Sequence, residues 1–223
     1  MNLKVIITGA TGMVGEGVLH ECLQHPDVSQ VLVVGRKPSG KSHAKLTEIV
    51  HRDFQDLSPV ADQFTGYDAC FFCLCVTSIG LKEPAYHKLT YDLTLHFAAA
   101  MIIHNPNSVF IYVSGAGTDS TEAGKTMWAR VKGKTENALM RLPFKKTYMF
   151  RPGYMQPTNG LTNSLKAYKF LGWTYPLLRK MFPNSVSTLK EVGLAMINAV
   201  IQLPPKSILE VKDIVALASS VTH

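Results

Sequence analysis

Short apolar runs alternate along the chain with longer segments in which apolar residues recur every three or four positions. The runs are rich in β-branched residues and too short for helices, which indicates buried strands. These strands are expected at Leu3–Ile7, Gln30–Gly35, Leu46–His51, Ala69–Val76, Val109–Val113, Lys146–Phe150 and Leu209–Val211. The periodic segments predict helices at Glu16–Gln24, Tyr86–His104, Lys125–Leu142 and Val186–Ile201. This alternation predicts an α/β fold, a doubly wound parallel sheet with helices on both faces.

The first strand leads directly into three glycines at three-residue intervals, Gly9, Gly12 and Gly15. One glycine allows a turn with positive φ, one lets the backbone approach a pyrophosphate, and one lets the helix pack closely on the strand. Backbone N–H groups at the start of that helix favour phosphate; these belong to Thr11, Gly12, Met13 and Val14. The flanking strand and helix favour a dinucleotide-binding turn over an ordinary tight turn.

The second strand ends in Gly35-Arg36-Lys37, with no carboxylate close by. At this position an acidic residue accepts hydrogen bonds from the adenine ribose in NAD sites, whereas an arginine suits a 2′-phosphate. A guanidinium offers a bidentate fork to phosphate, and Lys37 adds a second charge. The pattern predicts NADP(H) in preference to NAD(H); the alternative is two solvated cations in a loop.

The composition indicates one sizeable core in a chain of 223 residues, of which 46% are hydrophobic and 17% charged. The net charge of +7 is spread along the chain without a block of five like charges, so we expect a solvated basic surface that helps attract a phosphorylated cofactor, and no nucleic acid as partner. A homodimer is compatible with the sequence. No signal peptide and no stable membrane insertion are expected, which predicts a cytoplasmic protein.

Three of the four cysteines lie in the run Cys70-Phe-Phe-Cys73-Leu-Cys75. On an extended strand Cys73 and Cys75 face one side and Cys70 faces the other, and no further His or Cys pair completes a tetrahedral set. We therefore expect free cysteines that serve as small apolar residues and no metal site.

The regular alternation of strands and helices lapses after Tyr154. We expect a single domain, 1–223, in which residues 154–190 form a small substrate or lid segment. The stretch Leu165–Phe182 mixes bulky apolar residues with lysine and arginine, and a lid is favoured over a basic helix on a membrane because glycine and proline interrupt it. Ser187 is the expected N-cap of the following helix, with Thr188 or Glu191 completing the capping pattern.

With these residues in view, the chain resembles the short-chain dehydrogenase/reductase superfamily, in its atypical branch of Tat-interacting-protein-like NAD(P)H-binding proteins and proteins similar to NAD-dependent epimerases and dehydratases. The resemblance covers most of the chain, and its motifs are TGATGMVG, FFCLCVTS, YVSGAG, VKGKTEN and RPG. It implies a Rossmann fold with a small C-terminal substrate lobe. The cofactor contacts it implies, together with the turn and cations above, are Gly9, Thr11, Gly12, Met13, Val14, Gly15, Arg36, Lys37, Asp53, Phe54, Leu74, Cys75, Lys132, Pro152 and Gly153.

Catalysis in that superfamily depends on a serine and on a tyrosine four residues before a lysine. The resemblance carries this pattern over to Ser114 and Lys132, with Lys132 as a contact of the nicotinamide ribose. The alternative for Ser114 is a turn hydroxyl that is satisfied within the glycine-rich loop. Trp128 stands in the tyrosine's place, and an indole N–H cannot act as a general acid or base. Other groups that the resemblance places near the cleft are Tyr86, Tyr91, Tyr154 and Asp92.

Two functions remain open from the sequence. The first is an NADP(H)-dependent oxidoreductase or epimerase/dehydratase-like enzyme that acts on a small carbonyl or hydroxyl substrate. The alternative is a non-catalytic NADPH-binding regulatory or sensor protein, which the loss of the tyrosine favours.

Overall fold

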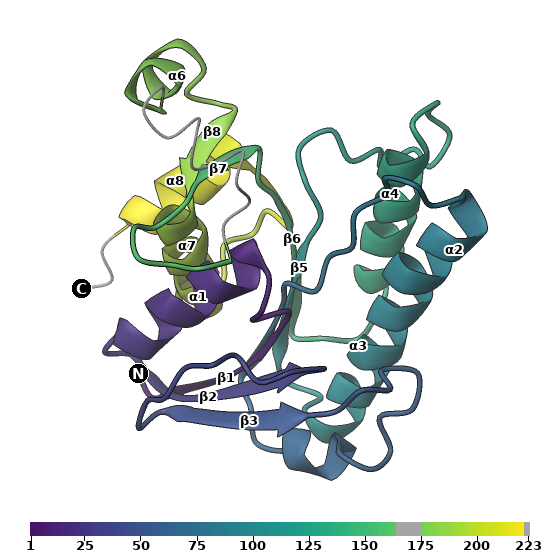
Figure 1. Ribbon diagram of the computed structural model, residues 1–223, viewed down its shortest axis with the longest axis vertical. Coiled ribbons are helices and arrows are strands. Elements are labelled where there is room, and N and C mark those ends of the chain that lie inside the picture. The colour runs from purple at the N-terminus through teal and green to yellow at the C-terminus, as the bar shows by residue number, and fades with distance from the viewer. Residues whose placement is uncertain (164–174, 221–223) are drawn as a thin grey trace.

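A seven-stranded sheet forms the centre of the computed structural model, which describes residues 1–163 and 175–220 (Figure 1). In chain order the strands are β1 (Leu3–Thr8), β2 (Val28–Gly35), β3 (Leu46–Val50), β4 (Ala69–Phe72), β5 (Val109–Val113), β6 (Lys146–Arg151) and β9 (Ile208–Glu210). They lie in the order β3-β2-β1-β4-β5-β6-β9, and all neighbouring pairs are parallel. The predicted doubly wound parallel sheet is therefore confirmed.

Helices cover both faces of this sheet (Figure 1). One face carries α1 (Met13–Gln24), α7 (Leu189–Gln202) and α8 (Val211–Ser219). The other carries α4 (Met127–Leu139) and a long helical run of α2 (Glu83–His87), the π-helical turn η2 (Lys88–Asp92) and α3 (Leu93–His104). A short 3-10 helix, η1 (Ala61–Phe64), precedes β4.

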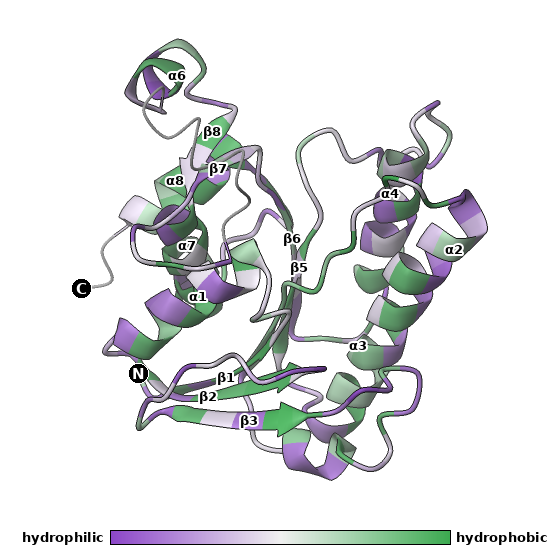
Figure 2. Ribbon diagram, viewed as in Figure 1, coloured by the Kyte–Doolittle hydropathy of each residue, from purple (hydrophilic) through white to green (hydrophobic). Residues whose placement is uncertain are grey.

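The strands bury side chains on both faces. In β1, Val5 and Ile7 belong to the core under α1 and α7, whereas Ile6 belongs to the core under α3. Figure 2 accordingly shows the inner strands largely in the hydrophobic colour. A strand covered on both faces has no polar side, which explains why these segments read as continuous apolar runs in the sequence.

Several predicted elements have different bounds in the structure, and two of these differences concern the cavity and the start of α7. The strand expected to reach Val76 ends at Phe72, because the following residues leave the sheet and line a cavity. The helix expected from Val186 begins at Leu189. The three residues before it form β8 (Val186–Thr188), which pairs with β7 (Tyr154–Gln156) in a separate two-stranded parallel sheet.

The N-cap of α7 is Thr188 rather than Ser187. The backbone N–H of Glu191 donates to Thr188 Oγ1 at 3.0 Å, and the N–H of Thr188 donates to Glu191 Oε2 at 2.7 Å. This reciprocal capping box satisfies two backbone donors that the helix leaves unpaired. Ser187 and Thr188 both belong to β8, and the helix begins at Leu189, which makes Thr188 the residue directly before it.

The expected lid is only partly described. Residues 164–174, in the middle of the expected segment 154–190, lie outside the described residues. Its second half contains α6 (Tyr175–Met181), and Arg179 of this helix forms a 2.7 Å ion pair with Glu191 of α7. Within residues 1–163 and 175–220, no helix is long and apolar enough to span a membrane.

Candidate functional site

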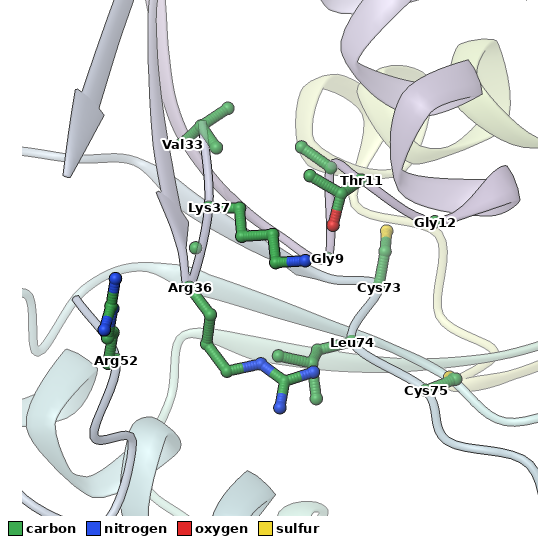
Figure 3. Close-up of a pocket in the computed structure, with 12 residues that line it drawn as sticks. Gly9, Thr11, Gly12, Val33, Arg36, Lys37, Arg52, Cys73, Leu74 and Cys75 are labelled. Atoms are coloured by element: carbon green, nitrogen blue, oxygen red, sulfur yellow. The ribbon is translucent and has the colours of Figure 1, made fainter. Parts of the chain in front are cut away.

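A cavity of about 620 Å³ opens at the carboxyl ends of β1, β2 and β4 (Figure 3). The chain runs from β1 to β2 and β3 in one direction and then crosses to β4 on the other side of β1. Open α/β sheets bind ligands at such a reversal of strand order. The cavity is lined by Gly9, Ala10, Thr11, Gly12, Val33, Gly35, Arg36, Lys37, Arg52, Cys73, Leu74 and Cys75.

The glycine turn forms one wall of the cavity. Gly9 has φ +72°, and a Cβ on it would lie 2.6 Å from the carbonyl oxygen of Cys73. Gly12 is the N-cap of α1, and its N–H donates to Gly9 O at 2.9 Å. A Cβ on Gly15 would collide with the Gly9 carbonyl, so α1 packs directly on the turn. The N-terminus of α1 thereby lies at the wall of the cavity, and helix N-termini favour phosphate groups.

Three cations line the same cavity. Arg36 and Lys37 follow β2, as the sequence indicated, and Arg52 follows β3. All three side chains are exposed. In Figure 3, Lys37 extends in the direction of Gly9, and Arg36 extends in the direction of Leu74. Arg52 was not anticipated from the sequence, although it immediately precedes the expected cofactor contact Asp53.

A buried carboxylate near the start of α1 joins three distant segments. Glu16 is 1% exposed and accepts hydrogen bonds from the N–H groups of Thr162 (3.1 Å) and Asn163 (2.7 Å). It also pairs with Lys41 at 3.1 Å. Burial alone would raise the pKa of Glu16, but the hydrogen bonds from Asn163 and Thr162 and the bond from Lys41 outweigh it and lower the pKa. Helix α1 is thus tied to the segment that precedes residue 164.

The remaining expected cofactor residues are distributed unevenly around the cavity. Leu74 and Cys75 line it, and the Cys75 thiol donates to Val113 O at 3.1 Å. Phe54 faces the core, where its ring stacks on Phe97 at 6.1 Å, and exposed Asp53 accepts a hydrogen bond from Gln55 N at 2.9 Å. Asp53 and Phe54 lie outside the residues that line the cavity, and so do six others: Met13, Val14, Gly15, Lys132, Pro152 and Gly153.

Ser114 follows β5 and is turned into a buried ionic network. Its hydroxyl donates to Glu136 Oε1 at 2.5 Å, and it is only 5% exposed. Glu136 is fully buried and receives Nε (3.0 Å) and Nη2 (2.5 Å) of Arg151. The hydrogen bonds from Arg151 to Glu136 raise the pKa of the guanidinium. Ser114 Oγ therefore already has a partner in the protein, and neither Glu136 nor Arg151 was anticipated from the sequence.

Lys132 and Trp128 lie one turn apart on α4, beside the loop that follows β5. The Lys132 ammonium donates to the carbonyl oxygen of Ser114. The Trp128 ring lies against Gly117, with its Cη2 atom 3.6 Å from where a Cβ would stand. The residue pair of the superfamily thus keeps its helical spacing, with an indole in the place of the phenol.

The other candidate acids are buried or contact other groups of the protein. Tyr86 is 1% exposed, and Tyr154 donates to Gln156 Oε1 at 3.1 Å. Asp92 pairs with His87 at 3.3 Å, and the ring of Tyr91 lies 4.6 Å from that histidine. None of the four lines the cavity described above.

The cysteines behave as apolar residues in the part of the chain that the structure describes. Cys22, Cys70 and Cys73 are buried, and burial raises the pKa of the Cys70 and Cys73 thiols. These thiols therefore stay neutral. No group of three potential metal ligands occurs within the described ranges.

Comparisons with known proteins show the family to which the chain belongs. A family described as NAD(P)H-binding matches residues 9–149. Protein fmp52, mitochondrial, from Emericella nidulans is 30% identical over 157 residues, which cover 67% of this chain and 66% of that protein. Protein HTATIP2 from Rattus norvegicus is 27% identical over 156 residues, covering 69% of this chain and 63% of that protein. The chain spans about two thirds of the length of these curated relatives.

Solved structures agree on the fold. An oxidoreductase of the short-chain dehydrogenase/reductase family from Burkholderia thailandensis superposes with a TM-score of 0.64 at 15% identity, covering 90% of this chain and 86% of that one.

The prediction of a cytoplasmic protein is wrong, because the fungal relatives are named mitochondrial proteins. The residues matched and the glycine turn at their start show that this chain belongs to the NAD(P)H-binding family.

Proposed function

We propose that the protein binds NADP(H) in preference to NAD(H). The observation that carries this proposal is the cavity at the strand reversal, which combines the glycine turn with Arg36 and Lys37. The turn offers backbone donors to a pyrophosphate, and the guanidinium of Arg36 matches a 2′-phosphate. When bound, the dinucleotide supplies hydride chemistry, whereas this chain supplies binding and orientation. Lys132 holds the nicotinamide ribose in this arrangement.

Replacing Arg36 by aspartate tests the cofactor preference. The wild-type protein is expected to bind NADPH at least tenfold more tightly than NADH. Arg36→Asp is expected to reverse this order, because a carboxylate repels the 2′-phosphate and accepts hydrogen bonds from the free ribose hydroxyls. Titration followed by tryptophan emission measures both affinities. Equal binding of the two cofactors by the wild-type protein would overturn the preference.

A regulatory or sensor role is the second candidate and uses the same bound cofactor. Two observations favour it over an oxidoreductase or epimerase-like enzyme: Trp128 occupies the tyrosine position, and the Ser114 hydroxyl is bonded to Glu136. Neither group is then available to move a proton to or from a carbonyl substrate. In this role, cofactor binding at the turn acts on residues 154–190 through Glu16, which holds Thr162 and Asn163.

Limited proteolysis distinguishes the two roles. Trypsin is expected to cut near Arg179 and Lys180 several-fold more slowly in saturating NADPH, and no NADPH oxidation is expected with a panel of small aldehydes and ketones. A Glu16→Gln variant, which weakens the tie to residues 162 and 163, is expected to bind NADPH but lose the protection. Sustained carbonyl-dependent turnover would instead establish the enzyme.

A further inference from the structure

Arg52 lies where the segments that follow β2 and β3 run side by side. The two strands pair in parallel, with Gly35 opposite Val50, and His51 N donates to Gly35 O at 2.9 Å. Neighbouring strands are about 4.8 Å apart. Arg52 therefore enters the cavity from the strand next to the one that carries Arg36.

The positive charge in this part of the cavity has no counter-charge among the described residues. None of Arg36, Lys37 and Arg52 forms an ion pair with a carboxylate there. The acidic groups nearest in sequence are engaged elsewhere: Glu48 accepts from Ser39 N at 2.8 Å, and Asp53 accepts from Gln55 N. Like charges gathered in one cavity repel one another, and a bound anion relieves that repulsion.

The charge of a phosphate group on the ribose gives a reason for a second guanidinium in the cavity. A phosphomonoester carries about −1.5 to −2 charges at neutral pH. Arg36 alone neutralises about half of this charge, whereas two guanidinium forks match both its charge and its oxygens. Figure 3 shows Arg52 on the side of Arg36 away from the glycine turn, and Lys37 extending in the direction of that turn.

We propose that Arg52 is a specificity-determining residue that binds the phosphate on the adenosine ribose together with Arg36, while Lys37 serves the pyrophosphate. This inference rests on the proposed occupancy of the cavity by a dinucleotide. It assigns ribose-phosphate recognition to two adjacent strand ends instead of one.

Calorimetric titration with ADP, adenosine 2′,5′-bisphosphate and adenosine 3′,5′-bisphosphate tests the assignment in the full chain. Arg52→Gln is expected to weaken binding of the 2′,5′-bisphosphate about tenfold, which corresponds to about 1.4 kcal/mol, and to change ADP binding by less than about twofold. Arg52→Lys is expected to bind the 2′,5′-bisphosphate with an affinity between those of the wild-type protein and Arg52→Gln, because lysine keeps the positive charge but lacks the guanidinium fork. Arg141→Gln removes the same charge from an exposed site outside the cavity and is the matched control.

The outcomes separate this inference from the function on which it rests. A selective loss in Arg52→Gln, with none in Arg141→Gln, supports it. An unchanged affinity for the 2′,5′-bisphosphate in Arg52→Gln, or an equal loss for ADP, overturns it while the Arg36 result stands. If the wild-type protein binds the 2′,5′-bisphosphate no better than ADP, both proposals fall. If it binds the 3′,5′-bisphosphate more strongly than the 2′,5′-bisphosphate, the phosphate is assigned to the 3′ position, and only the NADP(H) preference is overturned.

Discussion

Arg151→Met is expected to lower the free energy of unfolding by about 3–5 kcal/mol. Glu136 is fully buried, and Arg151 gives it two of its hydrogen bonds. Without the guanidinium, the carboxylate keeps the Ser114 hydroxyl but has no ion-pair partner among the described residues. An uncompensated buried charge costs much more than a lost surface pair. Urea denaturation followed by circular dichroism measures the change.

Two further variants separate charge burial from lost packing. The double variant Glu136→Leu/Arg151→Met removes both charges and is expected to be more stable than Arg151→Met alone. Glu83→Ala breaks the exposed ion pair with Arg130, where Glu83 is 48% exposed, and is expected to cost less than about 1 kcal/mol. If the free energy of unfolding of Arg151→Met is within about 1 kcal/mol of the wild-type value, the buried pair does not stabilise the core as expected.

Gly9→Ala is expected to weaken NADPH binding at least a hundredfold. Alanine at φ +72° costs about 1–2 kcal/mol, and its Cβ would also stand 2.6 Å from the Cys73 carbonyl oxygen and 2.8 Å from Leu74 Cα. Both are backbone atoms, so the turn must shift and its N–H groups lose their alignment with the pyrophosphate. Tryptophan emission during NADPH titration measures the loss.

Gly66→Ala is the matched control for Gly9→Ala. Gly66 has φ +85°, but no atom lies within 4 Å of where its Cβ would stand, and it lies outside the cavity lining. The Gly66→Ala variant has the energetic cost of alanine at positive φ but no steric clash. Its free energy of unfolding is therefore expected to fall by about 1–2 kcal/mol, and its NADPH affinity is expected to stay unchanged. Equal NADPH affinity in wild-type and Gly9→Ala proteins would show that the dinucleotide does not use this turn.

Some features that were not predicted from the sequence could have been predicted from residues close together in the chain. Helix α8 follows β9 directly, and its buried residues Val211, Ile214 and Leu217 recur at intervals of three. That spacing is helical, and Asp213 three residues after Glu210 completes a capping box. Lys132 and Glu136 also share a helix face, which would have directed attention to the buried carboxylate.

The sequence by itself determined the parallel sheet, the glycine turn and the two cations after β2. These features depend on residues close together in the chain: β-branched runs buried on both faces, glycines at three-residue spacing, and a strand end followed by Arg36 and Lys37. The periodicity and the backbone freedom of glycine act locally, so they can be interpreted without the fold.

Only the tertiary structure decided which distant side chains meet. Glu16 is bonded to Thr162 and Asn163, 146 and 147 positions away, and Arg52 joins Arg36 only because β2 and β3 pair in parallel. Whether the Ser114 hydroxyl faces a ligand or the protein was likewise settled by Glu136. Such partners depend on helix packing and strand order, which set the distances between groups that no local pattern connects.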